Sequence, residues 1–76
     1  MEEKVRTIIA DVLNVTLDKV TLDTEIGELP EWDSLNNVRI ITELESKFSV
    51  KLEPELLMDL EDVSDIVELI EEMAHE

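Results

Sequence analysis

The sequence predicts an all-α protein: a small bundle of four helices, three longer and one short, with a long loop between the first and the second. Three stretches carry apolar residues at the i, i+3, i+4 and i+7 spacing of one helical face. The chain has 76 residues, of which only one is glycine and two are proline, so few positions can break a helix. A chain of this length has room for one small core, and we expect residues 1–76 to form a single domain.

The first helix is predicted over residues 2–13, and Asn14 is expected to end it. Its apolar face consists of Val5, Ile8, Ile9 and Val12. Residues 15–33 are polar and include Gly27 and Pro30, which predicts a long loop. The loop is expected to be held to the core by Val20, Leu22, Ile26 and Leu29.

The second helix is predicted over residues 34–48, and it has the clearest amphipathic pattern of the chain. One face of this helix is expected to be apolar, formed by Leu35, Val38, Ile41, Leu44 and Phe48.

The C-terminal third allows two interpretations, because no glycine or proline interrupts residues 55–73. Periodicity alone permits one continuous helix. Asp62, with Asp65 three residues later, is typical of a helix N-cap, so we predict a short helix after Pro54, a corner, and then a last helix. The short helix carries Leu56, Leu57 and Leu60, and the last one carries Val63, Ile66, Val67, Ile70 and Met73.

The composition excludes several functions. Six basic and 21 acidic residues give a formal charge of 6 − 21 = −15, which disfavours nucleic acids and anionic membranes and predicts basic partners. The absence of cysteine removes disulfides, thiolate metal sites and cysteine nucleophiles, and we expect no metal site. The N-terminus does not resemble a signal peptide and no apolar stretch is long enough to span a membrane, so we expect a cytoplasmic monomer.

The tripeptide Asp33-Ser34-Leu35 lies where the polar loop meets the helix predicted over residues 34–48. Aspartate and serine are both preferred N-cap residues, so the tripeptide can simply cap an ordinary helix. The serine hydroxyl also lies at the positive end of the helix dipole, beside unpaired backbone N–H groups, where a phosphate is favoured. Ser34 is therefore also a candidate attachment point.

The run from Trp32 to Val38, followed by Ile41, Leu44 and Phe48, resembles the signature of acyl carrier proteins. The predicted order of helices and loop matches that family over nearly the whole chain. The resemblance implies that a phosphopantetheinyl transferase moves a 4′-phosphopantetheine arm from coenzyme A onto Ser34, and that the thiol of the arm holds acyl groups as thioesters. It further implies a second role for Asp33, as a contact during loading.

The same resemblance implies a carrier and not an enzyme. The only histidine, His75, lies beside the C-terminus, so no Ser/His/Asp arrangement can be assembled around Ser34. The implied partners, besides the transferase, are acyl or aminoacyl loading enzymes and synthases or transferases with basic docking surfaces.

Partner recognition is expected to differ from that of fatty-acid carriers, in which the second helix is strongly acidic. Here the helix is formally neutral, and Asn36 and Arg39 stand where acids are usual. The acidity is shifted to residues 53–76, which contain ten acids and no lysine or arginine. The candidate recognition residues are Trp32, Leu35, Asn36, Arg39 and Glu43. Trp32 could alternatively cover the loop and the edge of the core, and Leu35 could anchor the core.

The cargo is also expected to be unusual. Candidate residues of the acyl pocket are Asn37, Val38, Ile41, Leu57 and Ile66. Leu57 and Ile66 are bulky where the family has small residues, which indicates either ordinary core packing or a specialised carrier for short, polar or aminoacyl groups. An aminoacyl or peptidyl carrier of the same fold is one alternative, and an acidic helical interaction module without a prosthetic group is another. A calcium loop is disfavoured, because Glu28 stands where an EF-hand requires glycine.

Overall fold

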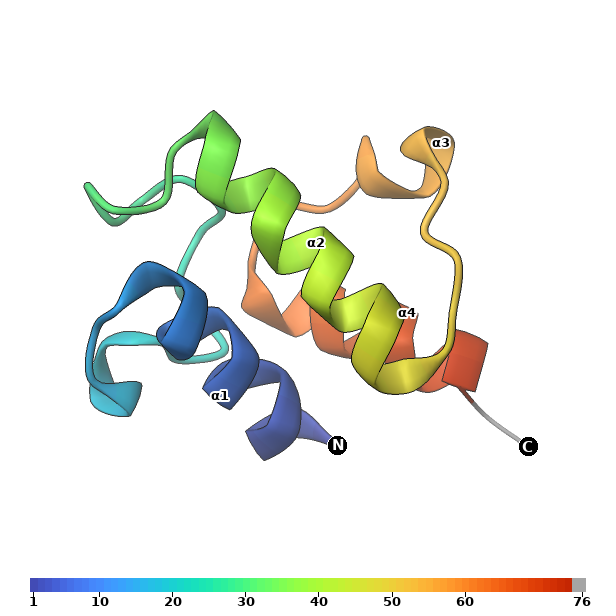
Figure 1. The fold of residues 1–76 in the computed structure, drawn as a ribbon, viewed down its shortest axis with the longest axis horizontal. Coiled ribbons are helices and arrows are strands. Elements are labelled where there is room, and N and C mark those ends of the chain that lie inside the picture. The colour runs from blue at the N-terminus through green and yellow to red at the C-terminus, as the bar shows by residue number, and fades with distance from the viewer. Residues whose placement is uncertain (75–76) are drawn as a thin grey trace.

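The computed structural model describes residues 1–74, and these form four α-helices and one short 3₁₀ helix (Figure 1). The elements are, in order, α1 (Glu2–Leu13), η1 (Leu17–Lys19), α2 (Ser34–Phe48), α3 (Pro54–Leu57) and α4 (Val63–Ala74). α1 packs against both α2 and α4, while the long loop and α3 lie on opposite sides of α2 in this view. The prediction of an all-α bundle with three longer helices and one short helix is confirmed.

Three helices and the loop share one core. Its fully buried side chains come from α1, α2 and α4, together with Val20 and Trp32 of the loop and Leu52 after α2. Within residues 1–74, no helix is long and apolar enough to cross a bilayer. The histidine considered above, His75, lies outside the described residues.

The predicted ends of α1 and α2 are confirmed, and both helices stop for the same physical reason. Asn14 and Ser49 follow the last helical residues with φ of 60° and 56°, in the left-handed region that terminates helices. Asparagine adopts this backbone readily because its short side chain can hydrogen-bond locally.

The predicted core face of α2 is partly wrong. Leu35 and Val38 are 68% and 61% exposed, whereas Ile40, which the predicted stripe omitted, is fully buried. The buried face is formed by Ile40 and Leu44, flanked by the half-buried Asn37, Ile41 and Phe48. Two stripes fit the helical period in this apolar segment, and both share Leu44 and Phe48, so spacing alone could not distinguish them.

The predicted corner between α3 and α4 is confirmed, and α4 is capped there by the side chain of Asp62. One carboxylate oxygen of Asp62 accepts the backbone N–H of Asp65 at 3.0 Å and the hydroxyl of Ser64 at 2.8 Å. In return, the carboxylate of Asp65 accepts the N–H of Glu61 at 3.0 Å. The pair differs from a capping box in one respect, because Asp65 accepts from the residue before the cap, and α4 starts at Val63. The predicted apolar stripe of α4 is buried, except for the half-buried Met73.

The long loop is tied to the start of α4 by backbone hydrogen bonds. Ile26 donates its N–H to the carbonyl of Glu61 at 2.9 Å, Val63 donates to Thr24 at 2.9 Å, and Ser64 donates to Leu22 at 3.1 Å. The predicted anchors of the loop are confirmed, because Val20 is fully buried and the side chains of Leu22, Ile26 and Leu29 are half-buried. The loop therefore delivers the chain to the start of α2 along a defined path.

Candidate functional site

The start of α2 is built by a side-chain cap. Asp33 has extended backbone, with φ of −99° and ψ of −175°, and its carboxylate accepts the N–H of Asn36 at 2.9 Å. Its carbonyl accepts the N–H of Asn37 at 2.8 Å, which closes the first helical turn. Ser34 is thereby fixed as the first residue of the helix, and it is exposed to solvent.

Two asparagines of the first turn reach back and hold the preceding loop. The side-chain amide of Asn36 donates to the carbonyl of Glu31 at 2.8 Å. The amide oxygen of Asn37 accepts the indole N–H of Trp32 at 2.9 Å. The sequence motif gave no reason to expect either contact. Together they connect the helix to the two residues just before the Asp33 cap.

The prediction of Trp32 as a partner-recognition residue is wrong. Its side chain is only 3% exposed and belongs to the buried core. A tryptophan is buried at little cost when its indole N–H finds an acceptor, and Asn37 supplies that acceptor here. The alternative role, covering the loop and the core edge, is the one that the structure supports.

Two consecutive turns bring the loop to Ser34. In the turn from Glu25 to Glu28, the N–H of Glu28 donates to the carbonyl of Glu25 at 2.9 Å, and Gly27 has a φ of 87° that favours glycine. In the next turn, the N–H of Trp32 donates to the carbonyl of Leu29 at 2.9 Å, and Pro30 occupies the position where its fixed φ is suitable.

The first turn of α2 is suited to bind an anion. Within residues 1–74, neither backbone N–H of Ser34 or Leu35 has a hydrogen-bond acceptor, so both remain available beside the serine hydroxyl. No acid lies in the first turn of α2, whereas the first turns of α1, η1, α3 and α4 all contain one. A phosphate on Ser34 would meet the positive end of the helix dipole, and the neighbouring carboxylate is that of the cap, Asp33, which accepts the N–H of Asn36.

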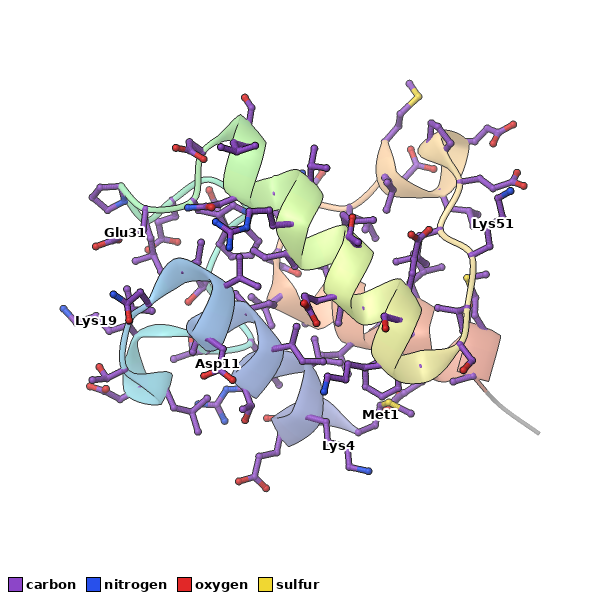
Figure 2. All side chains as sticks on the ribbon, viewed as in Figure 1. Met1, Lys4, Asp11, Lys19, Glu31 and Lys51 are labelled. Carbon is purple, nitrogen blue, oxygen red and sulfur yellow. The ribbon has the colours of Figure 1, made fainter. Side chains whose placement is uncertain are left out.

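The other candidate recognition residues lie on the surface of α2. Leu35, Arg39 and Glu43 are exposed, and Asn36 is half-buried because of its contact with the loop. Arg39 and Glu43 face α1 across a hollow of about 300 Å³ that Asp11 also lines. Arg39 is thus one of the cations along the groove between α1 and α2. Lys47 lines the same hollow, whereas Figure 2 places Lys4, Lys19 and Lys51 on α1, η1 and the α2–α3 connection.

The acyl-pocket candidates divide into two groups. Ile66 is 1% exposed and belongs to the core, and the half-buried Ile41 and Leu57 pack against that core. Asn37 is half-buried and engaged with Trp32. Val38 points outward, so its assignment to an interior pocket is wrong, for the same reason that the predicted stripe of α2 is rotated.

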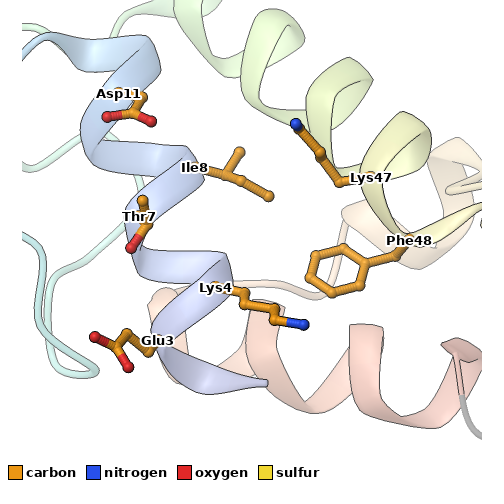
Figure 3. A pocket seen from close by; sticks show the side chains of 7 residues that line it. All are labelled: Glu3, Lys4, Thr7, Ile8, Asp11, Lys47 and Phe48. Carbon is orange, nitrogen blue, oxygen red and sulfur yellow. The ribbon is translucent and has the colours of Figure 1, made fainter.

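A separate hollow of about 510 Å³ lies between α1 and the last turn of α2. Figure 3 shows Ile8 of α1 and Phe48 of α2 directed into it, with Lys4 and Lys47 at its margins. Fourteen residues separate Ser34 from Phe48, which is about 21 Å along a helix. This hollow therefore does not belong to the serine site.

A smaller hollow of about 230 Å³ adjoins Ser34. Its lining comes from the loop and the first turn of α2, namely Ile26, Gly27, Trp32, Asp33, Ser34 and Asn37. Sequence reasoning missed Ile26 and Gly27 as neighbours of the serine. The single glycine of the chain was the available signal, because a lone glycine in a loop marks a special turn or a close approach.

Comparison with known proteins places this geometry in a family. The family model for the phosphopantetheine attachment site matches residues 3–70. The chain is 40% identical over 73 residues to the acyl carrier protein of Akkermansia muciniphila, covering 96% of this chain and 91% of that protein. It is 39% identical over 69 residues to the acyl carrier protein of Lactococcus lactis subsp. cremoris, covering 91% and 90%.

Solved structures agree with this result. The solution structure of the holo acyl carrier protein from Nitrosomonas europaea has a TM-score of 0.79 at 29% identity, covering 93% of this chain and 92% of that one. The holo acyl carrier protein from Geobacter metallireducens has a TM-score of 0.85 at 24% identity, covering 95% and 83%, and this likeness shows the fold.

The helical bundle and the family match define a carrier that bears a phosphopantetheine group, and not an enzyme. The chain belongs to the acyl carrier protein family. Its prosthetic group is covalently attached 4′-phosphopantetheine, and its partners include a phosphopantetheinyl transferase and acyl-handling enzymes. The exposed hydroxyl of Ser34, the two available N–H groups and the acid-free first turn fit such a group.

Proposed function

We propose that Ser34 carries the 4′-phosphopantetheine arm and that the protein is a specialised, cytoplasmic carrier. The observation that carries this proposal is the exposed hydroxyl of Ser34 beside two backbone N–H groups without an acceptor in the described chain. When bound, the arm supplies a thiol that holds acyl groups as thioesters. The chain itself supplies the anchoring oxygen and the positive helix end that favours the phosphodiester.

Loading forms a bond between Ser34 Oγ and the phosphorus of the arm. The P–O bond to the adenosine half of coenzyme A breaks, and 3′,5′-adenosine bisphosphate leaves. The serine proton passes to a base of the transferase. Asp33 has two compatible roles in this step: it fixes the first helical turn through Asn36, and it presents a carboxylate one residue from the hydroxyl.

The cargo we propose is a short, polar or aminoacyl group. Support comes from the filled interior, where Ile66 is buried and Leu57 and Ile41 pack against the same core. A long acyl chain would have to displace these side chains from a close-packed interior. An aminoacyl or peptidyl carrier of the same fold remains the alternative. The third interpretation, an interaction module without a prosthetic group, is set aside by the family match.

The partner enzymes we propose have basic docking surfaces and accept Arg39. Support comes from the uneven charge of the chain, because α2 carries Arg39 and Lys47 against Glu43 and Glu45, while the α3–α4 region carries no cation. A groove of about 300 Å³ between α3 and α4 has leucines in its lining and acids around them. Opposite charge on a partner would speed association and set its orientation.

The test is loading measured by mass. The purified protein is incubated with coenzyme A and a broad-specificity phosphopantetheinyl transferase, and intact mass is then recorded. We expect the gain of one phosphopantetheinyl group in the wild type and in Ser64→Ala, and no gain in Ser34→Ala. Ser64 is the matched control because it also lies in the first turn of a helix. An equal gain in Ser34→Ala would overturn the assignment of the attachment site.

A further inference from the structure

The hollow of about 230 Å³ lies on the loop side of Ser34. Attachment of the arm to the serine hydroxyl does not by itself require such a hollow. Its exposed lining is mostly apolar, although it includes the acid Asp33; the lining residues are Ile26, Gly27, Trp32, Asp33, Ser34 and Asn37. It is formed by the loop and the first turn of α2, without a residue of α3 or α4. In Figure 1 the loop lies on the opposite side of α2 from α3. The hollow is therefore distinct from the interior around Leu57 and Ile66.

Gly27 forms part of the wall of this hollow. Its φ of 87° belongs to a tight turn, and a Cβ at this position would lie 3.9 Å from the carbonyl oxygen of Trp32. The positive φ is what favours glycine here, because 3.9 Å is an ordinary contact distance and leaves room for a Cβ. The glycine thus provides the turn that borders the hollow beside the serine.

Trp32 and Asn37, which line the hollow, are held together by a hydrogen bond of defined polarity. The ring of Trp32 is buried, and its indole N–H fixes the amide of Asn37 with the oxygen toward the ring, because the indole can only donate. The NH₂ group of Asn37 is therefore directed away from the indole nitrogen. It remains a donor for a carbonyl or hydroxyl oxygen of a group seated in the hollow.

We propose that this loop-side hollow is the seat of the first part of the phosphopantetheine arm, an inference that rests on attachment at Ser34. The segment next to the phosphate has a carbon with two methyl groups, followed by a hydroxyl and an amide carbonyl. The two methyl groups match the apolar part of the lining, to which Ile26, Gly27 and Trp32 contribute. The hydroxyl or carbonyl accepts from the NH₂ of Asn37.

A seat on this side has a consequence for the cargo. An arm whose first part lies against the loop starts outside the interior around Leu57 and Ile66, because neither residue lines the hollow. The cargo is then held outside the bundle, where a short, polar group is stable without a pocket. The filled core and the open hollow thus both favour a cargo that is held outside the helical bundle.

The experiment uses isotope-labelled protein whose loading has first been confirmed by mass. Nuclear Overhauser effects are then measured from the geminal methyl protons of the arm. We expect cross-peaks to Gly27, to Ile26 and to the indole ring of Trp32. Ile26→Ala should lower the cross-peaks to the indole at least twofold. Leu29→Ala is the matched control, because Leu29 is equally half-buried in the same loop and does not line the hollow.

Two results would contradict the proposal in different ways. Full loading with no cross-peak to Ile26, Gly27 or Trp32, or with cross-peaks to Leu57 and Ile66 instead, would overturn the seat and leave the attachment site intact. Absence of any mass gain in the wild type would overturn both. The wild-type measurement decides the question even where a variant fails to fold.

Discussion

The starts of α2 and α4 share one capping chemistry and have opposite surroundings. Asp33 accepts the N–H of Asn36 at 2.9 Å, and Asp62 accepts the N–H of Asp65 at 3.0 Å, each three residues along the chain. After the caps the two helices differ. The first residue of α2 is the exposed Ser34, whereas the first residue of α4 is the fully buried Val63.

The backbone shows the same contrast. The first two N–H groups of α4 donate to the carbonyls of Thr24 and Leu22 of the long loop. The corresponding N–H groups of α2, those of Ser34 and Leu35, have no acceptor within residues 1–74. The hydroxyl of Ser64, in the first turn of α4, donates to the capping carboxylate of Asp62. The start of α2 is therefore left uncovered by the neighbouring chain, whereas the start of α4 is covered by the long loop.

The largest effect expected is on stability, and it should follow burial and not sequence position. Ile66→Ala, four residues after the α4 cap, should lower the free energy of unfolding by about 2–5 kcal/mol, because it opens a cavity in the core. Leu35→Ala, at the start of α2, should change it by less than about 0.5 kcal/mol, because Leu35 is exposed. Urea unfolding followed by circular dichroism measures both. Equal losses in the free energy of unfolding would contradict the contrast between a covered start of α4 and an uncovered start of α2.

A smaller effect is expected at the α2 cap, where two roles of Asp33 can be separated. Asp33→Ala should lower the free energy of unfolding by about 1 kcal/mol, because the N–H of Asn36 loses its acceptor. Asp33→Asn should retain most of the stability, because asparagine caps equally well. Loading rates of the two variants, measured with the transferase, then report on the carboxylate alone. If Asp33→Asn loads as fast as the wild type, Asp33 is only a cap.

The smallest effect is expected on acidification and concerns the α4 cap. The backbone N–H of Asp65 and, secondly, the hydroxyl of Ser64 lower the pKa of Asp62 from its ordinary value of 3.8, against a smaller opposing effect of burial. Because the pKa is lower in the folded state, the stabilisation is present above pH 3.8 and is lost as the pH falls through the lowered value.

This dependence is measurable as the urea midpoint between about pH 5 and pH 2. Asp62→Asn should flatten the fall in this range, because the amide caps the helix without titrating. Ser64→Ala should bring the pKa of Asp62 closer to 3.8, so that less stability is lost on acidification. An acid limb identical in all three proteins would mean that Asp62 does not contribute to it.

The contrast also explains which features could be predicted from the sequence. The ends of α1 and α2, the corner before α4 and the core stripe of α4 follow from caps and spacing, which are local properties. The buried face of α2 does not, because Leu35 and Val38 fit the helical period as well as Asn37 and Ile40 do. Which face of α2 is buried depends on contacts with α1 and the loop, which are distant in sequence.

The site shows the same division. The position of Ser34 at the exposed start of α2 was predictable, because a motif at a helix start can be read from neighbouring residues. The burial of Trp32 and its bond to Asn37 depend on how the loop folds back over the core, and no spacing rule contains that information. The hollow beside Gly27 likewise arises from the three-dimensional path of two turns.

The bonds between the long loop and α4 have a consequence for local opening. The loop cannot detach at residues 22–26 without breaking the three backbone hydrogen bonds that Ile26, Val63 and Ser64 donate. Segments linked in this way open together as one cooperative unit. The less stable segment then shows the same protection from amide exchange as the more stable one. The amides of residues 22–26 should therefore exchange together with those at the start of α4, although the sequence of this loop is polar and irregular.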